Sequence, residues 1–362
     1  MCASYRDKER KSNFESFANK ILTGIKEIDP PYAEKRAIWE LFQNALDTID
    51  DNGEIEILKT DIGFQFIHNG KAFKDVQIGG LIKQFSNGKK YGDNTENIGQ
   101  YGTGFLSTHV YGKKVIINSA VIDDTGTYKK LEDFELDRSA DNIEDLTNRL
   151  IQQDDQIADL CDNIDKEYTE YKQTVFEYVA NDFNKKSIDV MLEYIHNILP
   201  YIFCFNEKLK KVTIRNEIII TYFNPQFEDD FFKLNKEIQS KVTLLEFKYV
   251  ASSDLDLKII IPDHIIDTPK LFLHFPLVDT SIIGFNFIIH ANSFKPNRER
   301  DYLHLKGNND EILNDVNTNE DLLSKAKLLI IDKIKNDNSL NLLPLCNIIF
   351  YPDETEFELI LF

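Results

Sequence analysis

Glycine is distributed unevenly along this 362-residue chain, and the distribution limits how the chain can fold. More than half of its 15 glycines lie between Asn69 and Gly104, among many Asn, Lys and Asp residues. Glycine frees the backbone conformationally and is unfavourable inside helices and strands. The segment is therefore predicted to be a functional loop carried by the regular elements on either side of it.

Those flanking elements follow from hydrophobic periodicity. Before the loop, apolar residues at helical spacing predict an amphipathic helix over residues 32–50: Ala37, Ile38, Leu41, Phe42, Ala45, Leu46 and Ile49. Two β-rich runs, residues 54–58 and 62–68, are predicted to form a hairpin after it. Beyond the loop, the patterns predict helices over 105–111 and 187–199, the second ending at Pro200, and strands over 115–120, 128–136, 174–179, 212–215, 218–223, 243–250, 257–261 and 285–290. Such a mixture of helices and strands predicts an α/β protein.

Composition narrows the class of protein further. Hydrophobic residues make up 42% of the chain and aromatic residues 12%, which suffices for a large core and excludes a disordered chain. The net charge of −19 makes the surface repel phosphate backbones, so we do not expect nucleic-acid binding. No apolar run approaches the roughly 20 residues that cross a bilayer, so no membrane attachment is expected.

The cysteines indicate the compartment. Cys2, Cys161, Cys204 and Cys346 lie far apart and form no Cys-x-x-Cys pair, and the chain opens without an apolar signal segment. A reducing, cytoplasmic setting is predicted. The seven histidines show no His-Glu-x-x-His pattern, so they are predicted to be structural rather than metal ligands.

An acidic stretch lies further along the chain. Residues 141–170 hold ten carboxylates against two basic residues, yet a helical apolar stripe continues through and just beyond them: Ile157, Leu160, Ile164, Tyr168 and Tyr171. We interpret the stretch as a helix with a solvated acidic face. The alternative is a site for cations or for basic histone-tail peptides.

Polar residues on the first helix form the first candidate site. Glu40 and Asn44 are four residues apart, so they share a face, and Asp47 follows about one turn later. A carboxylate can accept a proton from water, while a neutral carboxamide oxygen suits a hard cation such as Mg²⁺. Taken alone, the same spacing also describes an ordinary solvated helix face.

The end of the glycine-rich loop forms the second candidate site. It consists of Gly99, Gln100, Tyr101, Gly102, Thr103, Gly104 and Phe105, a Gly-x-x-Gly-x-Gly motif that runs directly into a predicted helix. Backbone N–H groups in such a turn can bind an anion, and phosphate is the expected ligand. No parallel βαβ unit surrounds the motif and no Gly-Lys-Ser/Thr follows it, which excludes dinucleotide-binding and Walker-type loops.

In this order the two sites resemble the GHKL ATPases, a superfamily that includes gyrase B, MutL, histidine kinases and the ninety-kilodalton heat-shock chaperones. The matching segments are ELFQNALD, HNGKAF and GQYGTGF, and the resemblance covers roughly residues 30–185. Within the superfamily the chain is most similar to the chaperone-like nucleotide domains of sacsin and related bacterial proteins. The resemblance implies the Bergerat fold, a two-layer α/β (α+β) sandwich with a mixed, mostly antiparallel sheet.

Two domains are expected, because the pattern turns β-rich in the second half of the chain and indicates a boundary near residue 185; their roles are what the resemblance implies. Residues 1–185 would form the ATP-binding domain, with an N-terminal strap over residues 1–30 and an acidic helical insert over about 138–172. Residues 186–362 would form a smaller, β-rich, transducer-like α/β domain.

The family's functional residues map onto both candidate sites. By resemblance, Glu40 would activate the attacking water, Asn44 would bind Mg²⁺, and Asp47 would line the ATP site. Residues 79–97 would be the family's ATP lid, in which Lys89 or Lys90 could reach a phosphate. A merely exposed lysine pair is the alternative.

One departure from the family concerns base recognition. The aspartate of the family's Asp-x-Gly-x-Gly motif accepts a hydrogen bond from the adenine amino group, whereas this chain has His68, Asn69 and Gly70 there. Neighbouring residues of a strand point to opposite faces, so either His68 or Asn69 is expected to enter the pocket and accept through a neutral nitrogen or a carbonyl oxygen. The alternative is that His68 is a core histidine and that Asn69-Gly70 is just a turn.

Two further positions are assigned by the resemblance. Thr174 resembles the threonine that closes the adenine site. In members with a transducer domain, a basic residue of that domain contacts the γ-phosphate; Lys295 is the candidate for this catalytic role, with Arg298 and Arg300 beside it. A surface turn with solvated charges is the alternative.

Together the residues and the resemblance predict an enzyme that binds ATP with Mg²⁺ and hydrolyses it slowly to drive a conformational switch or dimer closure. A chaperone-like ATPase of this kind would suit a bacterial stress or anti-phage (antiviral) defence system. The expected partners are ATP and either a second copy of the chain, in a nucleotide-dependent homodimer, or a protein of the same system. The alternative is a nucleotide-sensing or degenerate binding module without turnover. A histidine kinase is disfavoured because no phospho-acceptor histidine precedes residue 30.

Overall fold

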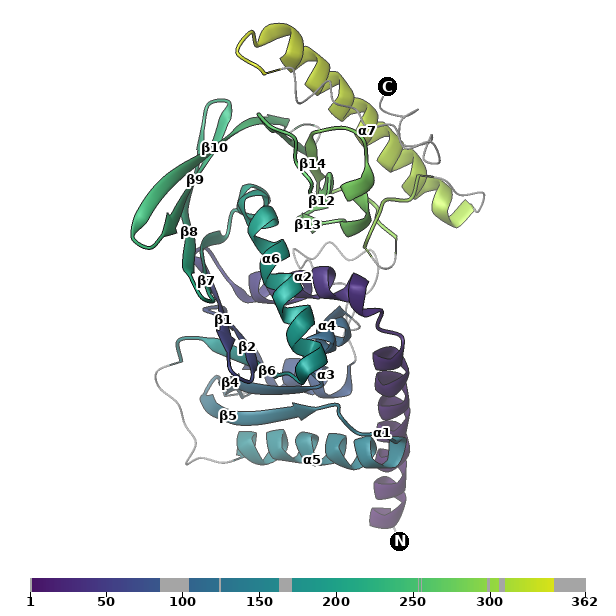
Figure 1. Ribbon diagram of the computed structural model, residues 1–362. Helices are drawn as coiled ribbons and strands as arrows, with labels where there is room; N and C mark the ends of the chain where they lie inside the picture. Colours follow the sequence, from purple (N-terminus) through teal and green to yellow (C-terminus); the bar gives the residue numbers. More distant parts are fainter. Residues whose placement is uncertain are drawn as a thin grey trace. The chain divides into compact units, whose positions relative to one another are not determined.

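The computed structural model describes residues 2–84, 104–123, 125–162, 171–252, 254, 256–297, 300–305 and 310–341. The chain divides into two compact units, residues 1–195 with 208–221 and residues 196–207 with 222–362. Each unit has its own helices and strands (Figure 1). The division into two domains between residues 185 and 186 stays a prediction.

The first unit is built on a mixed sheet, as predicted. Its strands are β1 (Gly53–Thr60), β2 (Gly63–His68), β3 (Phe73–Lys74), β4 (Lys114–Ile122), β5 (Tyr128–Asp137), β6 (Thr174–Val179) and β7 (Leu209–Arg215). They follow the order β7-β1-β2-β6-β4-β3, with β5 also paired to β4. The β1–β7 and β3–β4 pairs are parallel and the others antiparallel, so the predicted hairpin of β1 and β2 is confirmed.

Helix α2 (Pro30–Thr48) packs its apolar stripe on this sheet. The prolines at its first positions suit a helix start, since proline has no backbone N–H to leave without a partner there. Phe42 meets Phe66 of β2 with the ring centroids 5.5 Å apart, and both side chains are buried. Because β2 alternates, the same buried face carries Phe64, Phe66 and His68. The helix predicted from the 32–50 pattern is thereby confirmed.

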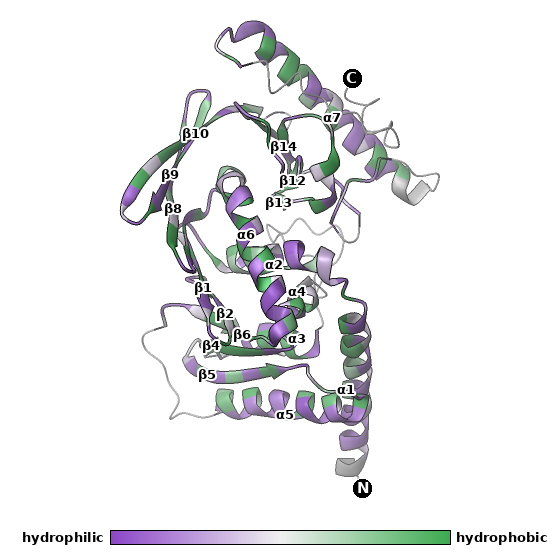
Figure 2. Cartoon of the chain, viewed as in Figure 1, coloured by the Kyte–Doolittle hydropathy of each residue, from purple (hydrophilic) through white to green (hydrophobic). Residues whose placement is uncertain are grey.

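The first unit also contains α1 (Cys2–Lys26), α3 (Asp75–Lys83), the short α4 (Gly104–Ser107), which runs into a 3₁₀ turn over Thr108–Val110, α5 (Ile143–Asp162) and the first part of α6 (Asp182–Phe205), up to residue 195. Helix α5 is the acidic helix, and its buried stripe includes Ile157 and Leu160 as predicted. Green and purple bands alternate along it in Figure 2. Helix α1 was not anticipated from the sequence patterns. Helix α3 and strand β3 correct the prediction that residues 69–104 form a loop, since both lie within its first part and α3 also covers the start of the predicted lid.

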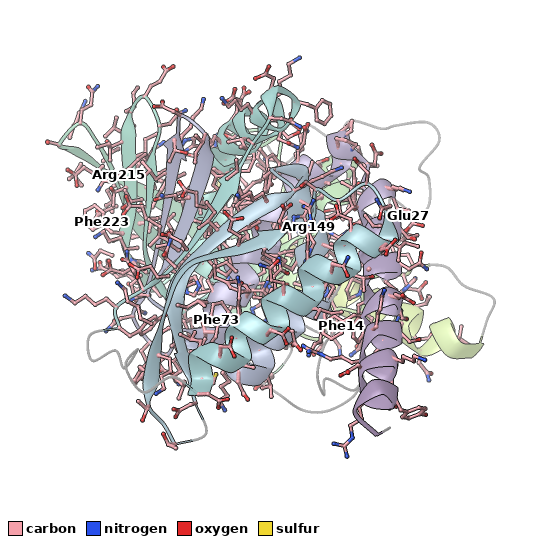
Figure 3. All side chains as sticks on the ribbon, turned by 90° about the horizontal axis from the view of Figure 1, so that it is seen from below. Phe14, Glu27, Phe73, Arg149, Arg215 and Phe223 are labelled. Carbon is pink, nitrogen blue, oxygen red and sulfur yellow. The ribbon has the colours of Figure 1, made fainter. Side chains whose placement is uncertain are left out.

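The acidic face of α5 is partly neutralised by basic residues of its neighbours. Arg10 of α1 contacts Asp154 at 2.9 Å and Asp155 at 2.7 Å, and Lys83 at the end of α3 reaches Asp154 at 2.8 Å. Phe14 lies where α1 meets α5 (Figure 3). Asp154 and Asp155 are thus paired with basic residues of the same unit, while the choice between a solvated face and a cation or peptide site stays a prediction.

Helix α6 (Asp182–Phe205) corrects the prediction that a helix ends at Pro200, because it continues for five residues beyond that proline. A proline inside a helix leaves the carbonyl four residues earlier without its usual N–H donor. Here that carbonyl belongs to His196, and the hydroxyl of Tyr222 donates to it at 3.4 Å. Among the described helices, α6 alone is long and apolar enough to span a membrane, yet 67% of its apolar window is buried inside the protein.

The second unit is β-rich, as predicted, and also contains a long helix. Its strands follow the order β8-β9-β10-β11-β14-β12-β13. They are β8 (Ile219–Glu228), β9 (Phe231–Ile238), β10 (Lys241–Ser252), β11 (Leu257–Ile261), β12 (Leu271–Leu273), β13 (Phe275–Pro276) and β14 (Ile288–Ala291). Helix α7 (Asp310–Asn336) contributes Leu322, Leu323 and Ala326 to a buried cluster with β11 and β14. Neither β9 nor α7 was anticipated, since their charged residues interrupt the apolar patterns.

Candidate functional site

One face of α2 carries a row of polar residues. Glu40, Asn44 and Thr48 follow at intervals of four residues and so lie one above another over a rise of about 12 Å. The Glu40 side chain is 15% exposed, Asn44 is exposed, and Asp47 is half-buried beside the row. The row has a carboxylate at one end and a hydroxyl at the other.

The first residue of α4 lies at the Glu40 end of this row. A Cβ atom placed on Gly104 would come within 2.0 Å of Glu40 Oε2 and 2.5 Å of its Cδ, so the carboxylate occupies the space that a side chain would need. Arg36, one turn earlier on α2, holds its Nη2 3.7 Å from Glu40 Oε1. The structure therefore brings together two residues that the sequence assigned to separate motifs.

At the Thr48 end of the row lies the turn after β2. Gly70 packs so tightly against Thr48 that a Cβ atom at position 70 would meet the Thr48 hydroxyl oxygen at 2.1 Å. The backbone N–H of Lys71 donates to the Thr48 carbonyl at 2.9 Å. Glycine is required here for its small size, which explains the Asn-Gly sequence better than a free turn would.

His68 ends the buried row of β2 beside this turn. Its Nδ1 accepts a hydrogen bond from the backbone N–H of Gly70 at 3.1 Å. The ring stacks on Phe176 at 6.1 Å, and the residue is 5% exposed. Burial lowers the pKa of His68 to about 4, so the imidazole is neutral at physiological pH.

Asn69 points to the other side of the sheet and is exposed. Its Oδ1 accepts from the backbone N–H of Glu54 at 2.9 Å, and its Nδ2 donates to the carbonyl of Asn52 at 2.7 Å. The amide thus ties the end of β2 to the start of β1. His68 thus lies on the buried face of β2, whereas Asn69 is among the residues that line a surface cavity at the end of α2.

Thr174, the first residue of β6, pairs directly with His68 in the sheet register and is fully buried. Its Oγ1 lies 2.7 Å from Ser119 Oγ and 3.0 Å from the Tyr171 hydroxyl. Tyr171 also donates to the carbonyl of Gly70 at 2.6 Å. Sequence reasoning missed Ser119 and the polar role of Tyr171, and no local pattern marks either one.

For the remaining residues of the predicted site, the structure either shows a packing role or gives no description. Phe105 is buried, with its ring 5.9 Å from that of Phe176, so it packs the core behind Gly104. Outside the described residues lie Lys89, Lys90, Gly99, Gln100, Tyr101, Gly102, Thr103 and Arg298. Their predicted roles in the lid, the phosphate turn and the basic loop stay predictions.

Lys295 belongs to the second unit and is exposed. Its backbone is held by Asn319 of α7, whose side chain accepts from Lys295 N–H at 2.8 Å and donates to the Lys295 carbonyl at 2.8 Å. Asn319 also donates to the carbonyl of His304 at 2.9 Å, and so fixes both ends of the basic loop. Arg300 in the same loop has a left-handed backbone, with φ of 60°.

A surface cavity of about 430 Å³ opens beside the Gly70 turn. It is lined on one side by the end of α2 and on the other by Tyr128 and Tyr171, whose rings stack at 6.0 Å. An ion pair between Lys71 and Asp50, at 2.7 Å, lies along its wall. The cavity makes the Thr48 end of the row accessible from solvent.

Among the described residues, no group of three or more His, Cys, Asp or Glu side chains is arranged to hold a metal ion. A carboxamide on a helix face, as at Asn44, nevertheless suits an ion whose other ligands are water and phosphate oxygens, which is the usual coordination of Mg²⁺. Comparisons with protein-family models and with curated proteins give no match to this chain. The resemblance to the GHKL ATPases therefore rests on the residues themselves.

Proposed function

We propose that this protein binds ATP with Mg²⁺ and hydrolyses it slowly, as a GHKL-type ATPase. The observation that carries the proposal is the contact between the Glu40 carboxylate and Gly104, the last glycine of the predicted phosphate turn. A base that activates water must lie next to the phosphate it attacks, so the two motifs have to meet. Their meeting supports a shared triphosphate site.

Glu40 would act as the general base. Its side chain is half-buried at 15% exposure, which keeps it oriented while leaving access to a water molecule. Arg36 lies close enough to restrict the rotamers of the carboxylate. Backbone N–H groups of the turn ending at Gly104 would bind the phosphate oxygens, so that most of the rate acceleration comes from positioning and charge stabilisation.

Asn44 would hold the metal ion with its side-chain oxygen, one turn from Glu40 on the same face. Bound Mg²⁺ would supply charge stabilisation on the phosphates. Thr48, His68, Gly70 and Thr174 would line the base end of the site, about 12 Å along the helix from the catalytic end. An extended nucleoside triphosphate fits this division into a phosphate end and a base end.

A degenerate binding module is the second candidate function. It is favoured by one observation, which is that neither His68 nor Asn69 supplies the carboxylate used by the family. Nucleotide would then act as a ligand that switches the conformation or the self-association of the chain. The nucleotide-dependent homodimer, the partner from a defence system and the cytoplasmic setting remain proposals under either function.

Single substitutions on α2 test the proposal. We expect Glu40→Ala to lower phosphate release by about 100-fold or more while leaving the Kd for ATP within about threefold. Asn44→Ala should weaken binding of the magnesium–nucleotide complex by about tenfold. Glu34→Ala, a change of another half-buried glutamate of the same helix, is the matched control and should alter neither quantity.

Phosphate release and calorimetric titration together separate the candidate functions. Tight binding of ATP by the unchanged protein without any turnover would favour the binding module. Turnover that survives both Glu40→Ala and Asn44→Ala would remove the ATPase assignment.

A further inference from the structure

The hydrogen bonds around His68 fix which of its ring nitrogens carries the proton. Backbone N–H of Gly70 donates to Nδ1 at 3.1 Å, so Nδ1 must offer its lone pair. A neutral imidazole has one protonated and one unprotonated nitrogen. The proton therefore resides on Nε2, which makes that atom a hydrogen-bond donor and leaves the ring with no free acceptor.

Within the described part of the chain, no group accepts the Nε2 proton of His68. The centroid of the ring lies 6.2 Å from that of Phe66 and 6.1 Å from that of Phe176, and the residue is 5% exposed. Burial lowers the His68 pKa to about 4, so a second proton is not taken up near neutral pH. A nearly buried donor without a protein partner is costly unless a ligand or water accepts from it.

The polar side chains next to His68 form hydrogen bonds with other partners and not with its Nε2. The side-chain oxygen and nitrogen of Asn69 both form hydrogen bonds with the backbone at the start of β1. Thr174 shares its hydroxyl with Ser119 and Tyr171, and the Tyr171 proton goes to the Gly70 carbonyl. The base end of the site thus presents a fixed donor at the position where the family presents a carboxylate acceptor.

Resting on the proposed function, we propose that His68 determines base specificity by donating a hydrogen bond from Nε2 to an acceptor on the six-membered ring of a purine. That acceptor is N1 of adenine or O6 of a 6-oxopurine. The exocyclic amino group of adenine is not read by this residue, because two donors facing each other repel. The polarity of base recognition is therefore the reverse of that in the family it resembles.

The test is a set of calorimetric titrations with magnesium complexes of four triphosphates. ATP is compared with purine riboside triphosphate, which lacks the amino group, with 1-deaza-ATP, which lacks N1, and with inosine triphosphate. We expect loss of the amino group to change Kd by less than about threefold. If N1 is the acceptor, 1-deaza-ATP binds about tenfold or more weakly than ATP; if O6 is the acceptor, inosine triphosphate binds about tenfold or more tightly.

A variant with a carboxylate at position 68 provides a second test of the proposal. His68→Asp replaces the donor by an acceptor and should reverse the preference, so that purine riboside triphosphate now binds about tenfold more weakly than ATP. Circular dichroism checks that the variant is folded, and His68→Asn provides a neutral substitute if it is not. The amide of His68→Asn both donates and accepts. Its ratio of Kd values for purine riboside triphosphate and ATP should therefore lie between those of the unchanged protein and of His68→Asp.

Two outcomes overturn the inference, and they are distinguishable. If the unchanged protein binds ATP at least tenfold more tightly than purine riboside triphosphate and does not distinguish 1-deaza-ATP, the amino group is read and only this inference fails. If no purine triphosphate binds, the proposed function fails and the inference fails with it.

Discussion

The Glu40 carboxylate occupies the space that a side chain on Gly104 would need, so that a single methyl group at position 104 would overlap Glu40 Oε2 at 2.0 Å. The two residues are 64 positions apart and begin as members of separate sequence motifs. Their contact requires α4 to start against the middle of α2, which is where the two helices pack. A larger residue at position 104 would therefore clash with Glu40 only if the Glu40 side chain occupies this position.

A double-mutant cycle tests this contact without any assay of activity. Gly104→Ala should lower the free energy of unfolding by about 1–3 kcal/mol, because the new methyl group displaces the carboxylate. In a Glu40→Ala background, where that space is empty, the same substitution should cost less than about 0.5 kcal/mol. Chemical denaturation of the four proteins gives the coupling.

Gly79→Ala is the matched control for that cycle. Gly79 lies within α3, where an added Cβ meets nothing within 4 Å, so alanine should stabilise the helix by about 0.5–1 kcal/mol in either background. Additive effects of Gly104→Ala and Glu40→Ala would contradict the contact.

The Tyr171 hydroxyl is predicted to organise the base end of the site. Tyr171→Phe removes the donor to the Gly70 carbonyl and the contact with Thr174, and should cost about 1 kcal/mol in stability. It should also weaken nucleotide binding, because the Gly70 turn and Thr174 lose their common partner. Tyr128→Phe, in the ring stacked on Tyr171, leaves that network intact and should change neither quantity. Equal effects of the two changes would show that the hydroxyl network is unimportant.

Stability is predicted to fall as the solution is acidified below neutral pH, in part because of His68. The unfolded chain takes up a proton on this histidine near pH 6.5, whereas the folded chain resists protonation until about pH 4. Stability from this residue is therefore complete above pH 6.5 and is lost as pH falls from 6.5 towards 4. Between pH 7 and pH 5 the loss should be about 2 kcal/mol.

Denaturation curves of the unchanged protein and of His68→Gln at pH 7 and pH 5 measure this contribution. The variant should lose about 2 kcal/mol less on acidification. Burial also lowers the pKa of His109, to about 3, so some pH dependence of the same sign should persist in the variant. Identical pH dependence in both proteins would contradict the burial of a neutral His68.

Elements with strong local periodicity were predictable from the sequence. The stripe from Ala37 to Ile49 places α2, and strand β6 begins and ends where the alternating pattern from Thr174 to Val179 does. Prediction was poorer where tertiary contacts override local preference. Helix α6 passes through Pro200, and the Tyr222 hydroxyl, from another element, lies 3.4 Å from the His196 carbonyl that the proline leaves without its helical donor.

Prediction of the candidate site from local sequence patterns was limited in the same way. Glu40, Asn44 and the glycine motif carry chemical types that the sequence displays, and the i, i+4 spacing alone puts the first two on one face. Ser119 and Tyr171 could not be found in this way, because their role depends on a hydroxyl network between residues far apart in the chain.

By itself, the sequence determined the helices and strands with clear periodicity, the chemical character of the two motifs and the presence of His-Asn-Gly at residues 68–70. Only the tertiary structure decided that Glu40 meets Gly104, that the Asn69 side chain binds the backbone at the start of strand β1, and that Nδ1 of His68 accepts from the Gly70 N–H. The physical reason is the separation along the chain of the residues that interact. Periodicity and residue chemistry are properties of neighbouring residues, whereas steric contact and the tautomer of a buried histidine depend on which distant atoms the fold brings within hydrogen-bond distance.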